Sequence, residues 1–127
     1  MNIRDISIQG IGGSFHDVVR SRLFPDSSYW PRDRFHQIFN DLEAKRAKYG
    51  IMAIENSIAG SLVFNYDLLA AHELRIVGEA YLRIRHNLMT LPGSKIEEIQ
   101  EVWSHPMAIY QSQRFLNQLP CSVLEKE

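Results

Sequence analysis

The chain has 127 residues, of which 45% are hydrophobic, and this is enough for one ordinary domain with a sizeable core. Its 14 basic and 15 acidic side chains give a net charge near −1, without the basic stripe that phosphate backbones require, so we expect no nucleic-acid partner. No uncharged apolar run approaches the roughly 20 residues of a membrane span, and the first ten residues lack the apolar core of a signal peptide. We therefore expect a cytoplasmic protein with no membrane partner.

Cysteine and histidine usage limits the possible metal chemistry. Cys121 is the single cysteine, which excludes an internal disulfide and any multi-cysteine metal site. The five histidines are scattered along the chain without the spacing of a ligand set. We therefore expect no metal.

The chain opens with a predicted strand over residues 3–9, which are rich in β-branched side chains. A glycine-rich turn follows at 10–13, and Ser14 with Asp17 forms the capping-box pattern at the start of a helix. The turn lacks the dinucleotide-binding fingerprint, because Phe15 stands where a third glycine is needed. It could still cradle a small anion against backbone amides, and a plain tight turn explains it about as well.

Residues 25–31 predict a connection that contains a short strand. Asp33 is predicted to cap a second helix, whose apolar stripe comprises Phe35, Ile38, Phe39 and Leu42. Lys45, Arg46 and Lys48 follow at the carboxyl end of this helix, where cations complement the helix dipole, and we interpret them as solvated. With the next strand, the first half predicts a parallel sheet covered by helices.

The most informative stretch starts with the apolar run 49–54, which predicts a central strand covered on both faces. The run ends abruptly in Glu55, Asn56 and Ser57, and an amphipathic helix follows with Leu62, Val63, Tyr66, Leu69 and Ala70 on one face. Such a junction is where open α/β sheets bind ligands. Asn56, Ser57 and Ser61 are also good N-cap residues, so ordinary helix capping explains the pattern about as well.

Residues 75–89 alternate between two faces, which predicts an extended strand of about 50 Å that passes from one lobe to another. A cleft between two lobes commonly encloses a small molecule. Arg83 and Arg85 could add positive potential to that cleft, although edge-strand charges that prevent aggregation are the more common case.

The remaining chain predicts a short helix at 95–100, a strand at 101–103 and a longer helix after Pro106, whose ring suits the first helical position. Ser104 and His105 thus occupy a third strand-to-helix junction. A lone histidine there is more often a cap than a catalyst. A strand-like segment at 121–124 ends the pattern.

Four segments closely resemble prephenate dehydratases: IENSIAGS (54–61), YDLL (66–69), IVGEAYLRIRHNLMTLPG (76–93) and SHPMA (104–108). QGIGGSF (9–15) resembles the opening turn of that family more loosely. The resemblance implies a two-lobed α/β fold similar to type II periplasmic-binding proteins, with the active site between the lobes. It implies a first lobe at 1–78, a partial second lobe at 79–127, and cofactor-free conversion of prephenate to phenylpyruvate in phenylalanine biosynthesis.

The same resemblance implies roles for individual residues. Glu55 is the candidate catalytic group, as a proton donor if burial raises its pKa, and it otherwise orients substrate with its neighbours. The substrate-binding candidates are helix-start and turn residues that could donate hydrogen bonds to the two carboxylates of prephenate. They are Ser14, Asn56, Ser57, Gly60, Ser61, Ser104 and His105.

Several features depart from the family pattern. The Thr-Arg-Phe motif, whose threonine assists departure of the hydroxyl group, does not occur, since the only threonine is Thr90. The regulatory ACT domain is also missing. Met107 stands where the family has glutamine, and Phe15 where it has a small residue. We therefore expect an incomplete second lobe and no activity from this chain alone. We also expect exposed apolar surface, which would lead to a homo-oligomer, most simply a dimer.

Two other classes of function compete with this interpretation. The same fold without its threonine could be a non-catalytic module that binds or senses a small carboxylate. A scaffold whose apolar surfaces serve only assembly would have no anion site at the three junctions. The resemblance ranks the dehydratase first.

Overall fold

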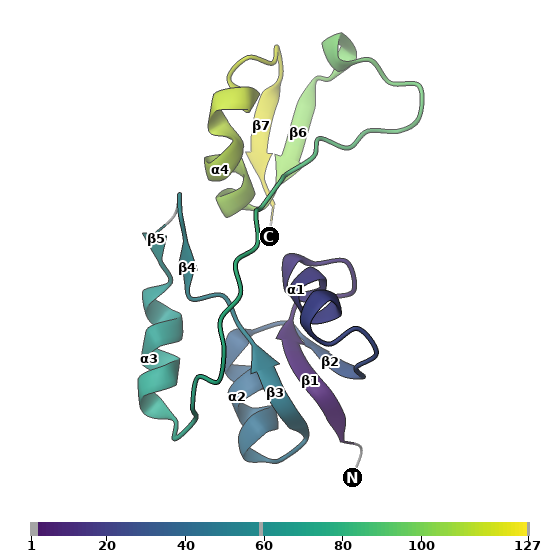
Figure 1. Ribbon diagram of the computed structural model, residues 1–127. Coiled ribbons are helices and arrows are strands. Elements are labelled where there is room, and N and C mark those ends of the chain that lie inside the picture. The colour runs from purple at the N-terminus through teal and green to yellow at the C-terminus, as the bar shows by residue number, and fades with distance from the viewer. Residues whose placement is uncertain (1–2, 59, 127) are drawn as a thin grey trace. The chain divides into compact units, whose positions relative to one another are not determined.

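The computed structural model describes residues 3–58 and 60–126 (Figure 1). The chain divides into two compact units, Met1–Arg83 and Ile84–Glu127, which are described separately. The expected lobe boundary between residues 78 and 79 stays a prediction.

The first unit is built on a parallel sheet of three strands, β1 (Arg4–Gln9), β2 (Tyr29–Arg32) and β3 (Ala47–Ile51). This confirms the parallel β-α-β-α-β pattern, including the short strand expected near residues 25–31. The sheet order is β2-β1-β3, so β1 is the central strand, and its Ile6, Ser7 and Ile8 are fully buried.

The prediction of a central strand at 49–54 was wrong. Within the described sheet β3 lies at one edge and ends at Ile51, and Lys48, Tyr49 and Gly50 are exposed. Residues 52–54 are half-buried outside any ladder. An apolar run cannot distinguish strand pairing from side-chain burial, and here only its first part pairs.

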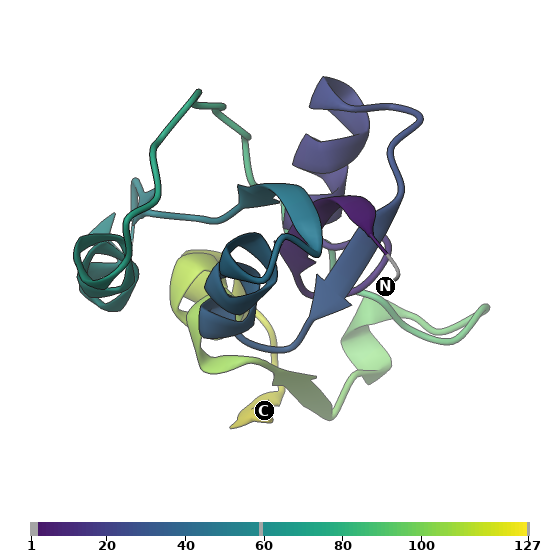
Figure 2. The ribbon, with the colours of Figure 1, turned by 90° about the horizontal axis from the view of Figure 1, so that it is seen from below.

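Helices α1 (Phe15–Leu23) and α2 (Phe35–Glu43) cover opposite faces of this sheet (Figure 2). Gly50 lies beside Ser7, and a Cβ added at Gly50 would come within 2.5 Å of Ile38 in α2, so α2 packs against that face. On the other face Phe24, just after α1, stacks on Tyr49 with ring centroids 5.5 Å apart.

The predicted apolar stripe of α2 is confirmed at Ile38 and Phe39, which are each 2% exposed. Asp33 does not cap this helix, because the N-cap residue is Arg34. The backbone N–H groups of Asp33 and Arg34 instead donate to Gln37 Oε1, at 3.0 and 3.1 Å. The side chain of Gln37, one turn inside the helix, therefore satisfies the two amides that precede the helix.

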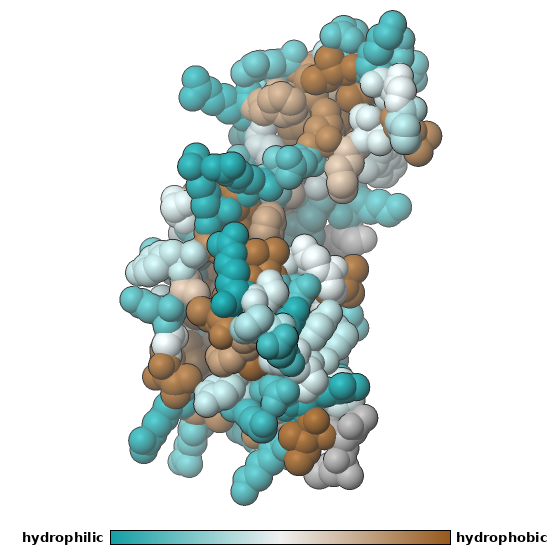
Figure 3. Space-filling model, turned by 45° about the vertical axis from the view of Figure 1, so that its right-hand side comes forward, coloured by the Kyte–Doolittle hydropathy of each residue, from teal (hydrophilic) through white to brown (hydrophobic). Residues whose placement is uncertain are grey.

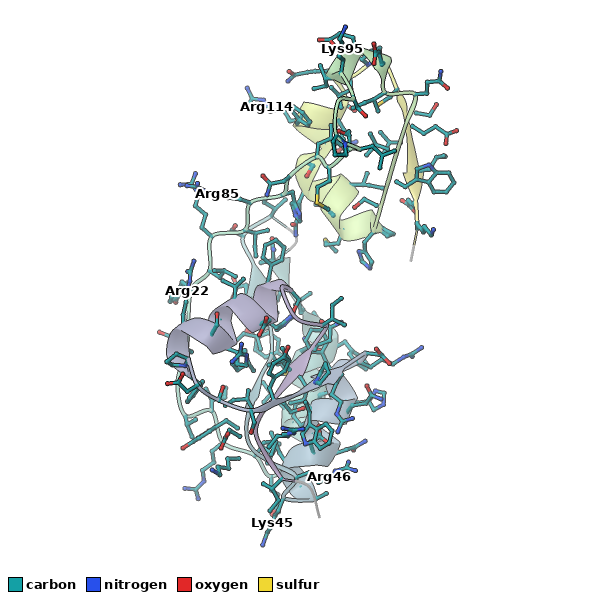
Figure 4. The ribbon with its side chains drawn as sticks, turned by 90° about the vertical axis from the view of Figure 1, so that its right-hand side faces the viewer. Arg22, Lys45, Arg46, Arg85, Lys95 and Arg114 are labelled. Atoms are coloured by element: carbon teal, nitrogen blue, oxygen red, sulfur yellow. The ribbon has the colours of Figure 1, made fainter. Side chains whose placement is uncertain are left out.

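A buried carboxylate joins α2 to the sheet. Asp41 is fully buried; Ser7 Oγ donates to it at 2.7 Å, and Arg32 Nε and Nη2 donate at 2.6 and 2.8 Å. Arg46, predicted to be solvated, lies at the lower end of the unit in Figure 4 and places Nη2 3.1 Å from Asp41 Oδ1. Burial opposes ionisation, but these hydrogen bonds and positive charges outweigh it and lower the pKa of Asp41 below 3.8.

After β3 the chain forms a small antiparallel hairpin, β4 (Glu55–Asn56) and β5 (Gly60–Ser61), and then helix α3 (Val63–Ala71). The expected direct passage from polar turn to helix was therefore wrong, and the N-cap residue of α3 is Leu62, which makes no side-chain cap bond. The expected apolar face is largely exposed, whereas Asn65 is 2% exposed.

The alternating segment at 75–89 is extended but forms no strand, since no described strand lies alongside it to exchange backbone hydrogen bonds. The predicted 50 Å strand was therefore wrong. Its apolar side chains are left on the surface, as at Tyr81, which is 90% exposed, and Figure 3 shows apolar side chains on the surface of the molecule. Arg83 and Arg85 are also exposed.

The second unit contains a 3₁₀ turn (Ile96–Glu98), β6 (Glu101–Ser104), α4 (Pro106–Leu116) and β7 (Ser122–Glu125). The helix predicted at 95–100 is reduced to this one turn. Both predicted strands are confirmed and pair with each other in parallel. Val102 of β6 and Leu116 of α4 are the buried apolar side chains of this unit.

We predict that Asp41→Asn strongly destabilises the first unit, because it leaves two guanidinium groups without their carboxylate. Breaking a buried ion pair costs about 3–5 kcal/mol, and the 41% exposure of the Arg46 side chain reduces this to about 2–3 kcal/mol. Urea denaturation at neutral pH measures the loss. The depressed pKa also means that the wild-type advantage is present above pH 3.8 and is lost as the pH falls below it.

The matched control is Lys48→Met, which breaks the Lys48–Asp5 ion pair of 2.7 Å on the same sheet. The Lys48 side chain is 64% exposed, so water and salt screen this pair and we expect little change. Equal unfolding midpoints for the two variants would contradict the role assigned to Asp41.

Candidate functional site

The candidate residues of the first unit follow the carboxyl ends of β1 and β3. These two strands are neighbours, and the chain leaves β1 toward β2 on one side and returns to β3 on the other. This is the topological switch point of the sheet, where α/β proteins bind ligands.

The turn after β1 is fixed by glycine geometry. Gly10 and Gly13 have φ angles of +90° and +85°, which favour glycine. A Cβ at Gly10 would lie 3.0 Å from Ser14 Oγ, so a side chain here would also crowd Ser14. The turn therefore presents Ser14 at the start of α1 close to the backbone of β1.

Ser14 is the N-cap residue of α1, and its hydroxyl accepts from the Asp17 N–H at 3.3 Å. The Asp17 carboxylate in turn accepts from the Gly13 N–H at 2.8 Å, and Arg20 lies 2.7 Å from it. The Gly13 hydrogen bond, followed by that of Arg20, lowers the pKa of Asp17. The chain's own carboxylate thus already serves this helix start, and an anionic ligand at Ser14 would have to compete with it.

The hairpin β4–β5 carries five candidate residues: Glu55, Asn56, Ser57, Gly60 and Ser61. Asn56 Oδ1 accepts from the Ile58 N–H at 2.9 Å, which stabilises the turn, and Gly60 has a φ angle of +80°. Glu55 is exposed in this unit, so the burial that a proton donor requires is not supplied by the first unit itself. The catalytic and binding roles of these residues stay predictions.

The backbone of Ala53 is held by two side chains that the sequence analysis did not select. Its N–H donates to His16 Nε2 at 3.2 Å, and its C=O accepts from Asn65 Nδ2 at 2.6 Å. His16 packs edge-on against Phe35, with ring centroids 5.5 Å apart, and burial lowers its pKa below 6.5. The available signals were a histidine two residues after the N-cap and a polar residue within an apolar helix.

In the second unit Ser104 ends β6, and His105 is the N-cap residue of α4. His105 Nδ1 accepts from the Met107 N–H at 3.1 Å, so Nδ1 is the acceptor of this ring and Nε2 is left as its donor atom. The capping interpretation of His105 is confirmed. Its role toward substrate stays a prediction.

No group of three or more metal-binding side chains occurs among the described residues. Across the same ranges, no helix is both long and apolar enough to cross a membrane.

The first unit is thus a parallel α/β sheet with a glycine turn and a polar hairpin at its switch point, which is where sheets of this class bind small molecules. The chain belongs to the prephenate dehydratase family, because the model of that family, described as "Prephenate dehydratase", matches residues 6–126.

The chain is similar to plant enzymes of this family. It is 40% identical over 114 residues to arogenate dehydratase/prephenate dehydratase 1, chloroplastic, of Arabidopsis thaliana. It is 37% identical over the same length to arogenate dehydratase 5, chloroplastic, of A. thaliana and to arogenate dehydratase 2 of Petunia hybrida. Each match covers 90% of this chain but only 27% to 29% of the relative.

A solved structure described as GqqA, a novel type of quorum quenching acylase, matches with a TM-score of 0.79 and 29% sequence identity. The match covers 97% of this chain and 45% of that chain. This confirms the predicted α/β fold class, of the two-lobed type II periplasmic-binding kind, of which the chain supplies part.

We predict that His105→Ala destabilises α4, because the Met107 amide loses its acceptor. Removal of an N-cap side chain costs about 1 kcal/mol, whereas His105→Asn should restore most of the loss, since asparagine is a good N-cap residue. Thermal unfolding followed by circular dichroism measures both variants. Equal losses for alanine and asparagine would show that capping is not the role of this side chain.

We predict that the His16 ring makes stability depend on pH in a defined window. Burial lowers the pKa of His16 in the folded state, so the unfolded chain takes up a proton on this ring at a higher pH than the folded chain does. The free energy of unfolding is therefore at its full value above pH 6.5 and decreases as the pH falls through the lower pKa of the folded state. His16→Gln lacks this proton and should lose less stability between about pH 7.5 and about pH 5. Urea midpoints at the two pH values provide the test, and parallel losses would refute it.

Proposed function

We propose that this chain acts in a prephenate dehydratase, a carbon–oxygen lyase that converts prephenate to phenylpyruvate in aromatic amino-acid biosynthesis. Membership of the family over residues 6–126 is the observation that carries this proposal. The polar hairpin at the switch point of the sheet supports it, because that is where a small anion would be held.

The reaction asks little of the protein beyond positioning and charge. The ring carboxylate of prephenate leaves as CO₂, its electron pair enters the ring, and the ring hydroxyl departs as water once it has received a proton. Aromatisation drives this elimination, so no cofactor is needed. The enzyme must hold two carboxylates and assist the departing hydroxyl.

The binding roles proposed for this chain follow its turns. Ser14 at the glycine turn and the hairpin residues Asn56, Ser57, Gly60 and Ser61 would donate hydrogen bonds to carboxylate oxygens, and Ser104 with His105 would do so from the second unit. His105 suits this role because Nδ1 caps α4, which leaves Nε2 as a donor. Glu55 is the proposed catalytic group, as a proton donor or as a group that orients substrate.

Arogenate is a second candidate substrate, because the similar plant proteins are named arogenate dehydratases. It carries an amino acid group where prephenate carries a keto acid, so the two differ by one positive charge. The shared ring carboxylate and hydroxyl would be held in the same way.

We also propose that the protein acts in the cytoplasm and assembles as a homodimer. Exposed apolar side chains such as Val63 and Phe64, 66% and 65% exposed, support association with a second copy. The names of several plant relatives place those proteins in chloroplasts.

We predict that the 127-residue chain binds prephenate without converting it, because its only threonine, Thr90, lies outside any Thr-Arg-Phe motif. Ser57→Ala should weaken binding about tenfold, the equivalent of one charge-assisted hydrogen bond. Arg22→Gln, at an exposed position of α1, is the matched control and should leave binding unchanged. Calorimetric titration with prephenate and with arogenate measures affinity. Turnover of prephenate is measured by the absorbance of phenylpyruvate, and turnover of arogenate by chromatography of phenylalanine. Binding of neither compound would contradict the proposal.

A further inference from the structure

The Ala53 backbone lies at the root of the hairpin that carries the candidate residues. The sheet ladder ends at Ile51, so the backbone groups of Ala53 are no longer paired by a neighbouring strand. His16 from α1 and Asn65 from α3 replace that pairing, one on the N–H and one on the C=O. Ala53 is half-buried, and leaving such groups without partners would be unfavourable.

Both side chains are themselves held in place. Asn65 is 2% exposed, and its donated bond of 2.6 Å fixes its amide with nitrogen toward Ala53. His16 must be neutral with its proton on Nδ1, because Nε2 accepts from Ala53. Phe35 packs against the His16 ring and limits its rotation.

The hairpin beyond Ala53 is closed on itself. Leu62 N–H donates to the Ile54 carbonyl at 2.9 Å, and the ladder pairs Glu55 with Ser61 and Asn56 with Gly60. These bonds tie the two arms of the hairpin to each other. The hairpin joins the sheet at Ala53 on one side and continues on the other side into α3, which carries Asn65.

His16 also belongs to the helix start that presents Ser14. The N-cap residue Ser14 and His16 are two residues apart on one turn of α1, so a bond from His16 to Ala53 sets the separation of the glycine turn from the hairpin. These are the two segments of the first unit that would hold the substrate.

We propose that His16 and Asn65 are positioning residues, which hold Ala53 so that Ser14 and the Glu55–Ser57 segment face one ligand in a fixed geometry. This inference rests on the proposed function for the identity of the ligand. Neither side chain needs to contact the substrate.

The test compares variants that keep or remove the two bonds. His16→Gln keeps an acceptor near the position of Nε2, whereas His16→Leu removes it at similar volume. Asn65→Asp is isosteric but turns an oxygen toward the Ala53 carbonyl in place of a donor. We expect His16→Leu and Asn65→Asp to raise the dissociation constant for prephenate at least about tenfold, and His16→Gln by less than about threefold.

A second measurement reports on the geometry without any ligand. Amide hydrogen exchange of Ala53, Glu55 and Asn56 should accelerate about tenfold or more in His16→Leu and Asn65→Asp. Ser7→Ala, which removes a hydrogen bond to Asp41 on the α2 face of the same sheet, is the matched control. It should lower the unfolding midpoint but change neither the exchange of these amides nor the affinity.

The outcomes separate this inference from the proposed function. If His16→Leu and Asn65→Asp behave like Ser7→Ala, the two residues only stabilise the fold and the inference is overturned. If the wild-type chain binds neither prephenate nor arogenate, the proposed function fails, and the exchange rates still decide: faster exchange in the hairpin supports positioning, and unchanged exchange overturns it.

Discussion

The first unit depends on one buried carboxylate, that of Asp41 in α2. Ser7 connects it to the central strand, Arg32 connects it to the end of β2, and Arg46 connects it to the turn that leads into β3. Three donors converge on one side chain because it is fully buried and cannot be satisfied by water. The consequence is a fixed relation between α2 and all three strands. That relation stabilises the sheet from whose carboxyl edge the candidate residues extend.

A second set of polar side chains acts just beyond the carboxyl end of β3. There the ladder stops, and His16 and Asn65 continue its pairing at Ala53. Helix α3 accordingly turns Asn65 toward its unit and leaves much of its apolar face exposed. A periodic apolar stripe shows that a helix is amphipathic but not which segment packs against it, which accounts for the misjudged face of this helix.

The three strand-to-helix junctions, alike in sequence, differ in structure. The junction after β1 is a glycine turn whose helix start is served by Asp17, the one after β3 is a hairpin, and the one after β6 is a histidine cap. Only the first and third are direct strand-to-helix turns. A common sequence pattern, a strand followed by polar residues and a helix, thus corresponds to three different local structures.

The sequence by itself determined the α/β class, the strands near residues 3–9 and 101–103, the capping role of Ser14 and the family, because these depend on local propensity and short motifs. Strand order, the hairpin at Glu55, the extended path of residues 75–89 and the bonds to Ala53 were decided by tertiary structure. Each depends on which segment lies alongside another, and a hydrogen bond between residues 37 positions apart, such as that from Ala53 to His16, leaves no periodic trace in the sequence.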